Sequence, residues 1–259
     1  PRKGPRRLSA SVTYPRELIC VDALKRRGIK MIVLDFDRTV MRIHAFGERI
    51  TPEQAATRDL DRDVRDLRLM EDLTAACKDR GVILVIASFG KKEVISTYMG
   101  RIVEKGFPVE QICTPADVKG LDGYSLPDGK NSQLEALRMR FKIEKPDMVM
   151  FFDDDGKNID LARGAGYPHS FYAPDAFHRT LWHQCVHAFV QFISGEEEAE
   201  RIRADISVPG EDMGHAAGGA AAGAVAGTDP SHFHPTLPAA AGGTADTTRP
   251  LFERSADEA

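Results

Sequence analysis

Residues 31–39 of the chain read MIVLDFDRT, and most of the fold can be worked out from them. The four apolar residues from Met31 to Leu34 are too few for an independent helix and are typical of a strand buried on both faces. Asp35 and Asp37 follow, and along an extended chain both carboxylates project to the same side. At the carboxyl end of a parallel strand this pair can bind Mg²⁺, whereas at an exposed strand end it is only two solvated acids.

Other apolar runs also end at polar residues. VILVIA stops at Ser88, and MVMFF runs directly into Asp153. The predicted strands are residues 31–34, 82–87, 111–114, 148–152 and 169–172. The helical spacing of apolar residues predicts helices at about 18–24, 64–81, 94–103, 132–141, 158–163 and 176–193. This alternation predicts an α/β fold, a Rossmann-like three-layer sandwich with a mainly parallel sheet.

The composition divides the chain into three parts. Residues 1–14 form a flexible basic arm that begins PRKGPRR, where a binding site is the alternative to a simple tail, and residues 15–194 carry the α/β domain. Residues 195–259 are rich in Gly, Ala, Pro and Thr and are expected to form a disordered low-complexity tail. Within the domain, residues 41–62 are polar and predict an irregular flap over the first strand end.

The overall composition narrows the possible partners. The chain has 259 residues and a net charge of −4, so it has no general attraction to nucleic acid or to an acidic membrane. No run reaches the roughly 20 apolar residues of a membrane helix. The four cysteines lie far apart, which indicates neither a zinc site nor a disulfide framework and favours a reducing, cytoplasmic location. A removed leader is the alternative, and the oligomeric state is not indicated.

Ser88 and Lys130 can each have either a functional role or only a structural or surface role. Ser88 lies close to the start of the next helix, where it can bind phosphate together with the helix amide groups or merely cap the helix. Ser132 and Glu135 form a capping-box pattern that leaves Lys130 just outside another helix. From there Lys130 can reach a neighbouring strand end or remain a solvated surface charge.

Acidic residues after the predicted strand 148–152 strengthen the metal hypothesis. They are Asp153, Asp154 and Asp155, with Asn158 close behind. Carboxylates gathered this closely repel one another, and a cation that bridges Asp35, Asp37 and Asp154 gives a reason for their assembly. The donors in these motifs are all oxygen atoms, which favours Mg²⁺ over zinc.

Four motifs occur in an order that resembles the haloacid dehalogenase-like superfamily of phosphohydrolases. They are DFDRT at 35–39, the strand-terminal Ser88, Lys130 ahead of its helix and FFDDDGKNI at 151–159. The resemblance covers about residues 28–175 and is nearest to the magnesium-dependent phosphatase branch. It implies hydrolysis of a phosphomonoester through an aspartyl-phosphate.

The resemblance also implies roles for individual residues. Asp35 would be the nucleophile and Asp37 the general acid and base. The implied phosphate-binding residues are Ser88, Phe89 and Lys130. The implied Mg²⁺ ligands are Asp35, Asp37 and Asp154, supported by Asp153 and Asn158. A carboxylate nucleophile divides phosphoryl transfer into two steps, while Mg²⁺ and a lysine offset the charge of the transferring group.

Two features of this chain qualify the resemblance. Many members of the superfamily have glycine after the second aspartate, whereas this chain has Arg38. The segments 41–62 and 106–129 leave little room for a cap, which predicts an open site that is capless or has a minimal flap. In this superfamily an open site accompanies large phosphorylated substrates such as proteins, or promiscuity. A phosphatase for one small molecule and a non-catalytic Mg²⁺-binding module on the same fold are the alternatives.

Overall fold

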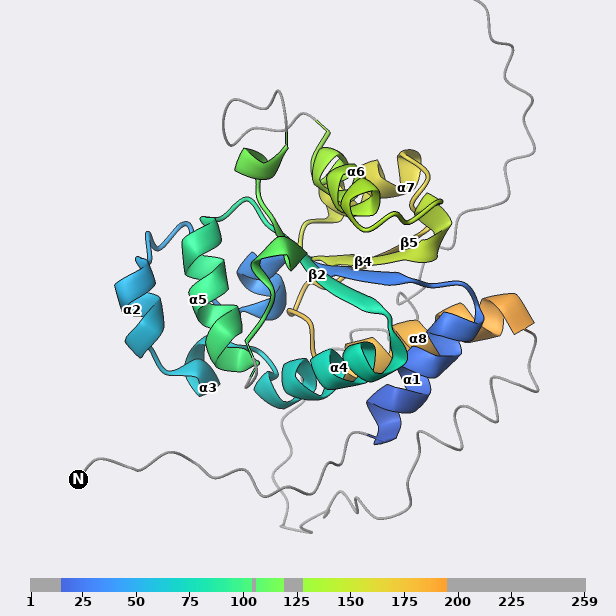
Figure 1. The fold of residues 1–259 in the computed structure, drawn as a ribbon, viewed down its shortest axis with the longest axis horizontal. Coiled ribbons are helices and arrows are strands. Elements are labelled where there is room, and N and C mark those ends of the chain that lie inside the picture. Colours follow the sequence, from blue (N-terminus) through green and yellow to red (C-terminus); the bar gives the residue numbers. More distant parts are fainter. Residues whose placement is uncertain (1–14, 104–105, 119–127, 195–259) are drawn as a thin grey trace, which may run out of the picture. The chain divides into compact units, whose positions relative to one another are not determined.

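The computed structural model describes residues 15–103, 106–118 and 128–194, all within one compact unit (Figure 1). The expected basic arm and the expected tail lie outside these residues. In chain order the helices and strands are α1 (Pro15–Arg26), β1 (Met31–Leu34), α2 (Pro52–Thr57), α3 (Leu60–Asp63), α4 (Leu67–Arg80), β2 (Ile83–Ala87), α5 (Lys92–Ile102), β3 (Ile112–Cys113), α6 (Asn131–Arg140), β4 (Val149–Asp153), α7 (Gly156–Gly164), β5 (His169–Tyr172) and α8 (Arg179–Ser194).

The five strands form one parallel sheet in the order β3-β2-β1-β4-β5, which confirms the predicted fold class. β1 is central and pairs with β2 on one side and with β4 on the other. From β1 the chain continues to β2 and β3 on one side of the sheet, and from β4 it continues to β5 on the other side. The boundary between β1 and β4 is therefore the point where the strand order reverses. Open α/β sheets bind ligands at such a switch point, beyond the carboxyl ends of the strands.

Helices cover both faces of the sheet, which makes three layers (Figure 1). Alternate strand residues such as Leu34 and Phe152 pack in a core with α1, α4, α5 and α8. Their neighbours Val33 and Phe151 pack in a second core with α6 and α7. Because each inner strand is buried on both faces, its sequence is continuously apolar rather than alternating.

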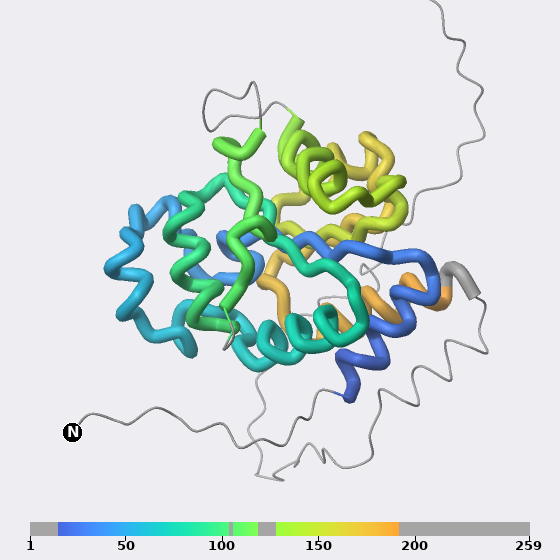
Figure 2. The backbone as a smooth tube through the Cα atoms, in the orientation of Figure 1, coloured from blue at the N-terminus to red at the C-terminus, as the bar shows by residue number. Residues whose placement is uncertain are grey.

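The flap segment is more ordered than predicted. Residues 41–62 contain α2 and nearly all of α3, and α2 lies beside α5 (Figure 2). Thr51 and Gln54 form a capping box at the start of α2, with Pro52 in its first turn. The prediction of an irregular flap is therefore wrong, since these residues carry a helix-start signal that we counted as polar loop.

Two helices begin later than predicted, α4 at Leu67 and α8 at Arg179. Before α4, Val64 pairs with Met41 in an isolated β-bridge, so it is held outside the helix. The side chain of Asp66 then caps α4, and its second oxygen accepts a hydrogen bond from the backbone of Arg179 at 3.0 Å. One carboxylate thus positions the starts of both helices.

The predicted capping box of Ser132 and Glu135 is wrong. The Ser132 hydroxyl donates to the carboxylate of Asp128, and Glu135 pairs with Arg138 at 2.6 Å. Lys130 nevertheless occupies the cap position of α6, where its side chain projects from the start of the helix.

A buried carboxylate, Asp63, fixes the α2–α3 segment to α5. It accepts hydrogen bonds from the Arg58 guanidinium at 2.6 and 3.0 Å and from the Tyr98 hydroxyl at 2.7 Å. Arg101 of α5 also donates to the backbone carbonyls of Ala55 and Arg58. Burial alone would raise the pKa of Asp63, but the hydrogen bonds from Arg58 and Tyr98 outweigh it and lower the pKa.

We predict that Asp63→Asn lowers the free energy of unfolding at pH 7 by about 2 kcal/mol, because hydrogen bonds to a charged acceptor are lost. The difference from wild type should shrink as the pH falls below about 4, where the wild-type carboxyl is protonated in the unfolded chain. Urea unfolding at pH 7 and at lower pH measures the free energy of unfolding of wild type and variant. Asp61→Asn, an exposed carboxylate on the same helix, is the control and should change stability by less than about 0.5 kcal/mol. Equal losses in the two variants would contradict this account.

Candidate active site

A buried ion pair lies at the centre of the site. The ammonium of Lys130 is 2.6 Å from Asp35 Oδ1 and donates to the backbone carbonyl of Ala87 at 2.9 Å. The two side chains are only 1% and 7% exposed. The ammonium also lies 3.9 Å from the ring centroid of Phe89. The ends of β1 and β2 and the start of α6 therefore meet at one lysine.

Two further carboxylates, from the end of β4, lie beside Asp35. Asp35, Asp153 and Asp154 each offer an oxygen, and these oxygens lie within 4.8 Å of one another. Asp153 is fully buried and accepts hydrogen bonds from the Asn158 amide at 3.1 Å to each oxygen and from the backbone of Asp155 at 2.8 Å. Asp154 is only partly buried. The arrangement suits Asp153 to support the site and Asp154 to bind an ion.

The carboxylates repel one another. Burial, and then the charge of Asp35, raise the pKa of Asp153, and the same two causes raise the pKa of Asp154 to about 6. Lys130 acts in the opposite direction on Asp153. A divalent cation would relieve the repulsion, and a set of carboxylate oxygens without histidine or cysteine fits Mg²⁺.

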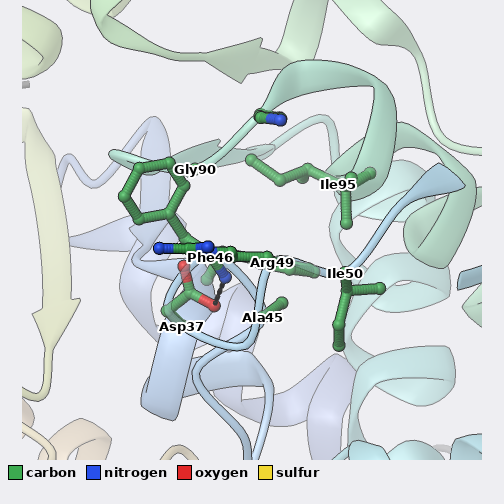
Figure 3. Close-up of a pocket in the computed structure, with 10 residues that line it drawn as sticks. Asp37, Ala45, Phe46, Arg49, Ile50, Gly90 and Ile95 are labelled. Carbon is green, nitrogen blue, oxygen red and sulfur yellow. Dashed lines mark hydrogen bonds between the residues drawn. The ribbon is translucent and has the colours of Figure 1, made fainter.

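Asp37, which we expected to share the ion, is not in this group of carboxylates. It lies in a turn at Phe36–Val40 that is closed by a hydrogen bond from the Met41 N–H to the Phe36 carbonyl at 3.0 Å, so the strand that ends at Leu34 does not continue to it. Its Oδ1 accepts a hydrogen bond from the backbone of Phe46 at 3.3 Å, and its side chain lines a small cavity (Figure 3). Burial, and then the charge of Asp35, raise the pKa of Asp37.

Ser88 does not cap the helix that follows it, because Lys91 occupies that position. The Ser88 side chain is buried, and its oxygen accepts a hydrogen bond from the backbone of Gly90 at 3.0 Å. A Cβ on Gly90 would lie 3.2 Å from Ser88 Oγ and 3.4 Å from Asp37 Oδ2. The absence of a side chain at Gly90 thus leaves open the space that the hydroxyl and the carboxylate both border.

Sequence reasoning missed two residues that support the site. Gln133, fully buried in α6, donates to the carbonyls of Ser88 at 2.8 Å and Cys113 at 3.0 Å, which ties together the ends of β2 and β3. Gly129 has φ +60°, and a Cβ there would lie 2.7 Å from Asn158 Oδ1. The PDG sequence before Lys130 is a turn signal that could have identified the glycine; nothing in the periodicity distinguishes Gln133.

Arg38 occupies the left-handed region at φ 60°, a conformation that costs a residue with a side chain about 1 kcal/mol more than glycine. Its backbone donates to the carbonyl of Ile43 at 3.1 Å, which holds the turn. Glycine at this position would avoid that cost. The exposed guanidinium also opposes the rise in the pKa of Asp154, so its charge acts on the candidate ion site.

We compared the sequence and the structure with those of known proteins. The sequence matches no protein-family model and no curated protein. Among solved structures, the chain is similar to the N-terminal part of BF1531 from Bacteroides fragilis, described as containing a phosphatase domain complexed with Mg, with 14% identity and a TM-score of 0.41. The alignment covers 61% of this chain and 39% of that one, and we draw no argument from so distant a likeness. Across the described ranges, no helix is both long and apolar enough to cross a membrane.

The raised pKa of Asp154 predicts a pH-dependent stability in metal-free protein. The folded state holds this proton more tightly than the unfolded state, so stability falls as the pH rises from about 4, the pKa in the unfolded chain, to about 6, and it stays low above that. In EDTA at pH 7.5, Asp154→Asn should therefore melt at a higher temperature than wild type, and at pH 4.5 the difference should be clearly smaller. Added Mg²⁺ at pH 7.5 should raise the Tm of wild type more than that of the variant. A difference in Tm that does not change with pH would contradict this electrostatic account.

Proposed function

We propose that this protein is a Mg²⁺-dependent phosphomonoesterase that forms an aspartyl-phosphate on Asp35, as its resemblance to the haloacid dehalogenase-like superfamily implies. One observation carries the proposal: Asp35 pairs with the buried ammonium of Lys130 and also lies beside the carboxylates of Asp153 and Asp154. A site that only binds a cation needs carboxylates but no lysine. A carboxylate that must attack a phosphate also needs positive charge close to it, to offset repulsion between the two anions.

In the first step, an Asp35 oxygen attacks phosphorus as the bond to the leaving oxygen breaks. Asp37 donates its proton to that oxygen, so the leaving group departs as a neutral alcohol. The raised pKa of Asp37 favours the protonated form that this step requires. Lys130 has three N–H groups, and its bonds to Asp35 and Ala87 leave one for the phosphoryl oxygens.

In the second step, Asp37 removes a proton from water, which attacks phosphorus and restores the Asp35 carboxylate. The buried Ser88 hydroxyl and the backbone around Gly90 face the same space as Asp37 and can hold phosphoryl oxygens. A bound Mg²⁺ would neutralise charge on the phosphate and orient it for in-line attack. Asp35 and Asp154 would hold the ion, while Asn158 fixes Asp153 behind them.

We propose that the substrate is a phosphorylated protein or another large phosphomonoester. A nucleotide or sugar phosphate is the small-molecule alternative. A non-catalytic Mg²⁺-binding module is the alternative of another class. The presence of Asp37 together with Asp35 argues against that module, because ion binding needs no general acid and base.

Asp35→Asn should abolish the proposed activity, because an amide cannot form the covalent intermediate. We expect kcat with a phosphomonoester and Mg²⁺ to fall by about 10³-fold or more. Asp160→Asn, an exposed carboxylate on α7, is the control and should keep wild-type activity. Activity of Asp35→Asn within tenfold of wild type would exclude Asp35 as the nucleophile.

Asp154→Ala should raise the Mg²⁺ concentration required for half-maximal activity and lower the maximal rate, because one ion ligand is removed. Asp155→Ser is the matched neighbour: Asp155 accepts a hydrogen bond from the backbone of Lys157 at the start of α7, and serine keeps a capping oxygen. Titrating Mg²⁺ in the activity assay separates the two variants. Identical Mg²⁺ dependence in both, or full wild-type activity in EDTA, would refute the metal assignment.

A further inference from the structure

A small cavity adjoins Asp37. Its volume is about 20 Å³, and its lining includes Asp37, Phe46, Arg49, Ile50, Gly90 and Lys91 (Figure 3). A cavity of this size has room for roughly one water molecule. A substrate group larger than water therefore has to lie across the rim of the cavity rather than inside it.

The rim carries two cationic side chains from separate segments, Arg49 from the turn before α2 and Lys91 from the start of α5. Both are exposed, and neither forms an ion pair with a carboxylate in the ranges that the structure describes. Both side chains line the same cavity as Asp37, but neither forms an ion pair with its carboxylate, so both charges are available to an anionic ligand.

The backbone of Arg49 is also in an unfavourable conformation. Its φ is 54°, in the left-handed region, and the turn is held by a hydrogen bond from its backbone N–H to the carbonyl of Phe46 at 3.0 Å. Next to it, the backbone N–H of Ile50 donates to the carbonyl of Ala45, also at 3.0 Å. An arginine is more strained in this conformation than glycine or asparagine would be, which suggests a function for its side chain.

The proposed reaction places the leaving group at this rim. If phosphorus is attacked by Asp35 and Asp37 protonates the leaving oxygen, that oxygen lies beside Asp37, and the rest of the leaving group extends past the cavity. We propose, on the basis of the proposed function, that the preferred leaving group carries a second anionic group, a carboxylate or another phosphate, which Arg49 and Lys91 bind. Phe46, partly buried on the same rim, offers an apolar surface to the atoms between the two charges.

The proposal is tested with two esters that differ by one charge. Phenyl phosphate and its para-carboxymethyl derivative have leaving phenols of similar basicity, so the chemical step is comparable. The wild-type protein with Mg²⁺ should hydrolyse the carboxymethyl ester with a kcat/KM about tenfold higher, a typical value for one charge-assisted contact. In Arg49→Gln and in Lys91→Gln the ratio of the two kcat/KM values should fall toward one.

Lys145→Gln is the charge-matched control, because this exposed lysine precedes the amino end of β4, whereas the site lies at the carboxyl ends of the strands. Its ratio should equal that of wild type. A wild-type ratio near one, or a ratio that the Arg49 and Lys91 variants leave unchanged, would overturn the inference. If neither ester is hydrolysed, the proposed function fails. Calorimetric binding of the two corresponding phosphonates then tests the recognition by itself, with tighter binding of the carboxymethyl compound expected and equal binding contradicting it.

Discussion

The arrangement of this domain depends on an imbalance of charge at the end of its central strand. Three carboxylates, from Asp35, Asp153 and Asp154, lie together beside one buried ammonium, that of Lys130. Buried charges are costly unless they are paired, and one lysine cannot compensate three acids. The raised pKa values of Asp153 and Asp154 express this cost. A cation bound from outside the chain would reduce this cost.

The sheet holds these opposing groups in place. The backbone of Asp35 donates to the carbonyl of Phe152 at 2.9 Å, which extends the pairing of β1 and β4 to the carboxylates themselves. The carbonyl of Asp153 in turn accepts a hydrogen bond from the backbone of Ala173 at 2.9 Å. The hydrogen-bonded neighbouring strands therefore keep the three acids close together, and a bound cation would relieve the repulsion between them.

The sequence predicted the parts of the site that depend on local pattern. The apolar runs ending at Asp35 and Asp153 identified two adjacent parallel strands, because buried parallel strands need continuous apolar sequence. It also predicted that Lys130 could reach a strand end, since a helix start next to the sheet limits where the side chain can lie.

What depends on tertiary contacts could not be predicted in this way. Asp37 leaves the carboxylate group because the chain turns directly after β1, and that turn is held by a hydrogen bond from Arg38 to Ile43. Gln133 resembles any polar helix residue until the ends of β2 and β3 are brought to it. The helices of the flap were missed because polar residues with a proline resemble a loop, although they begin with a capping box.

The central claim is that Asp35 is shared between Lys130 and a divalent cation held with Asp154. Anomalous diffraction from crystals grown with Mn²⁺, a Mg²⁺ substitute that also prefers oxygen ligands, tests it most directly. The account predicts one strong anomalous peak within bonding distance of carboxylate oxygens of Asp35 and Asp154, with the Lys130 ammonium still paired to the other oxygen of Asp35. A peak bound elsewhere, or no peak at this edge of the sheet at saturating Mn²⁺, would contradict it.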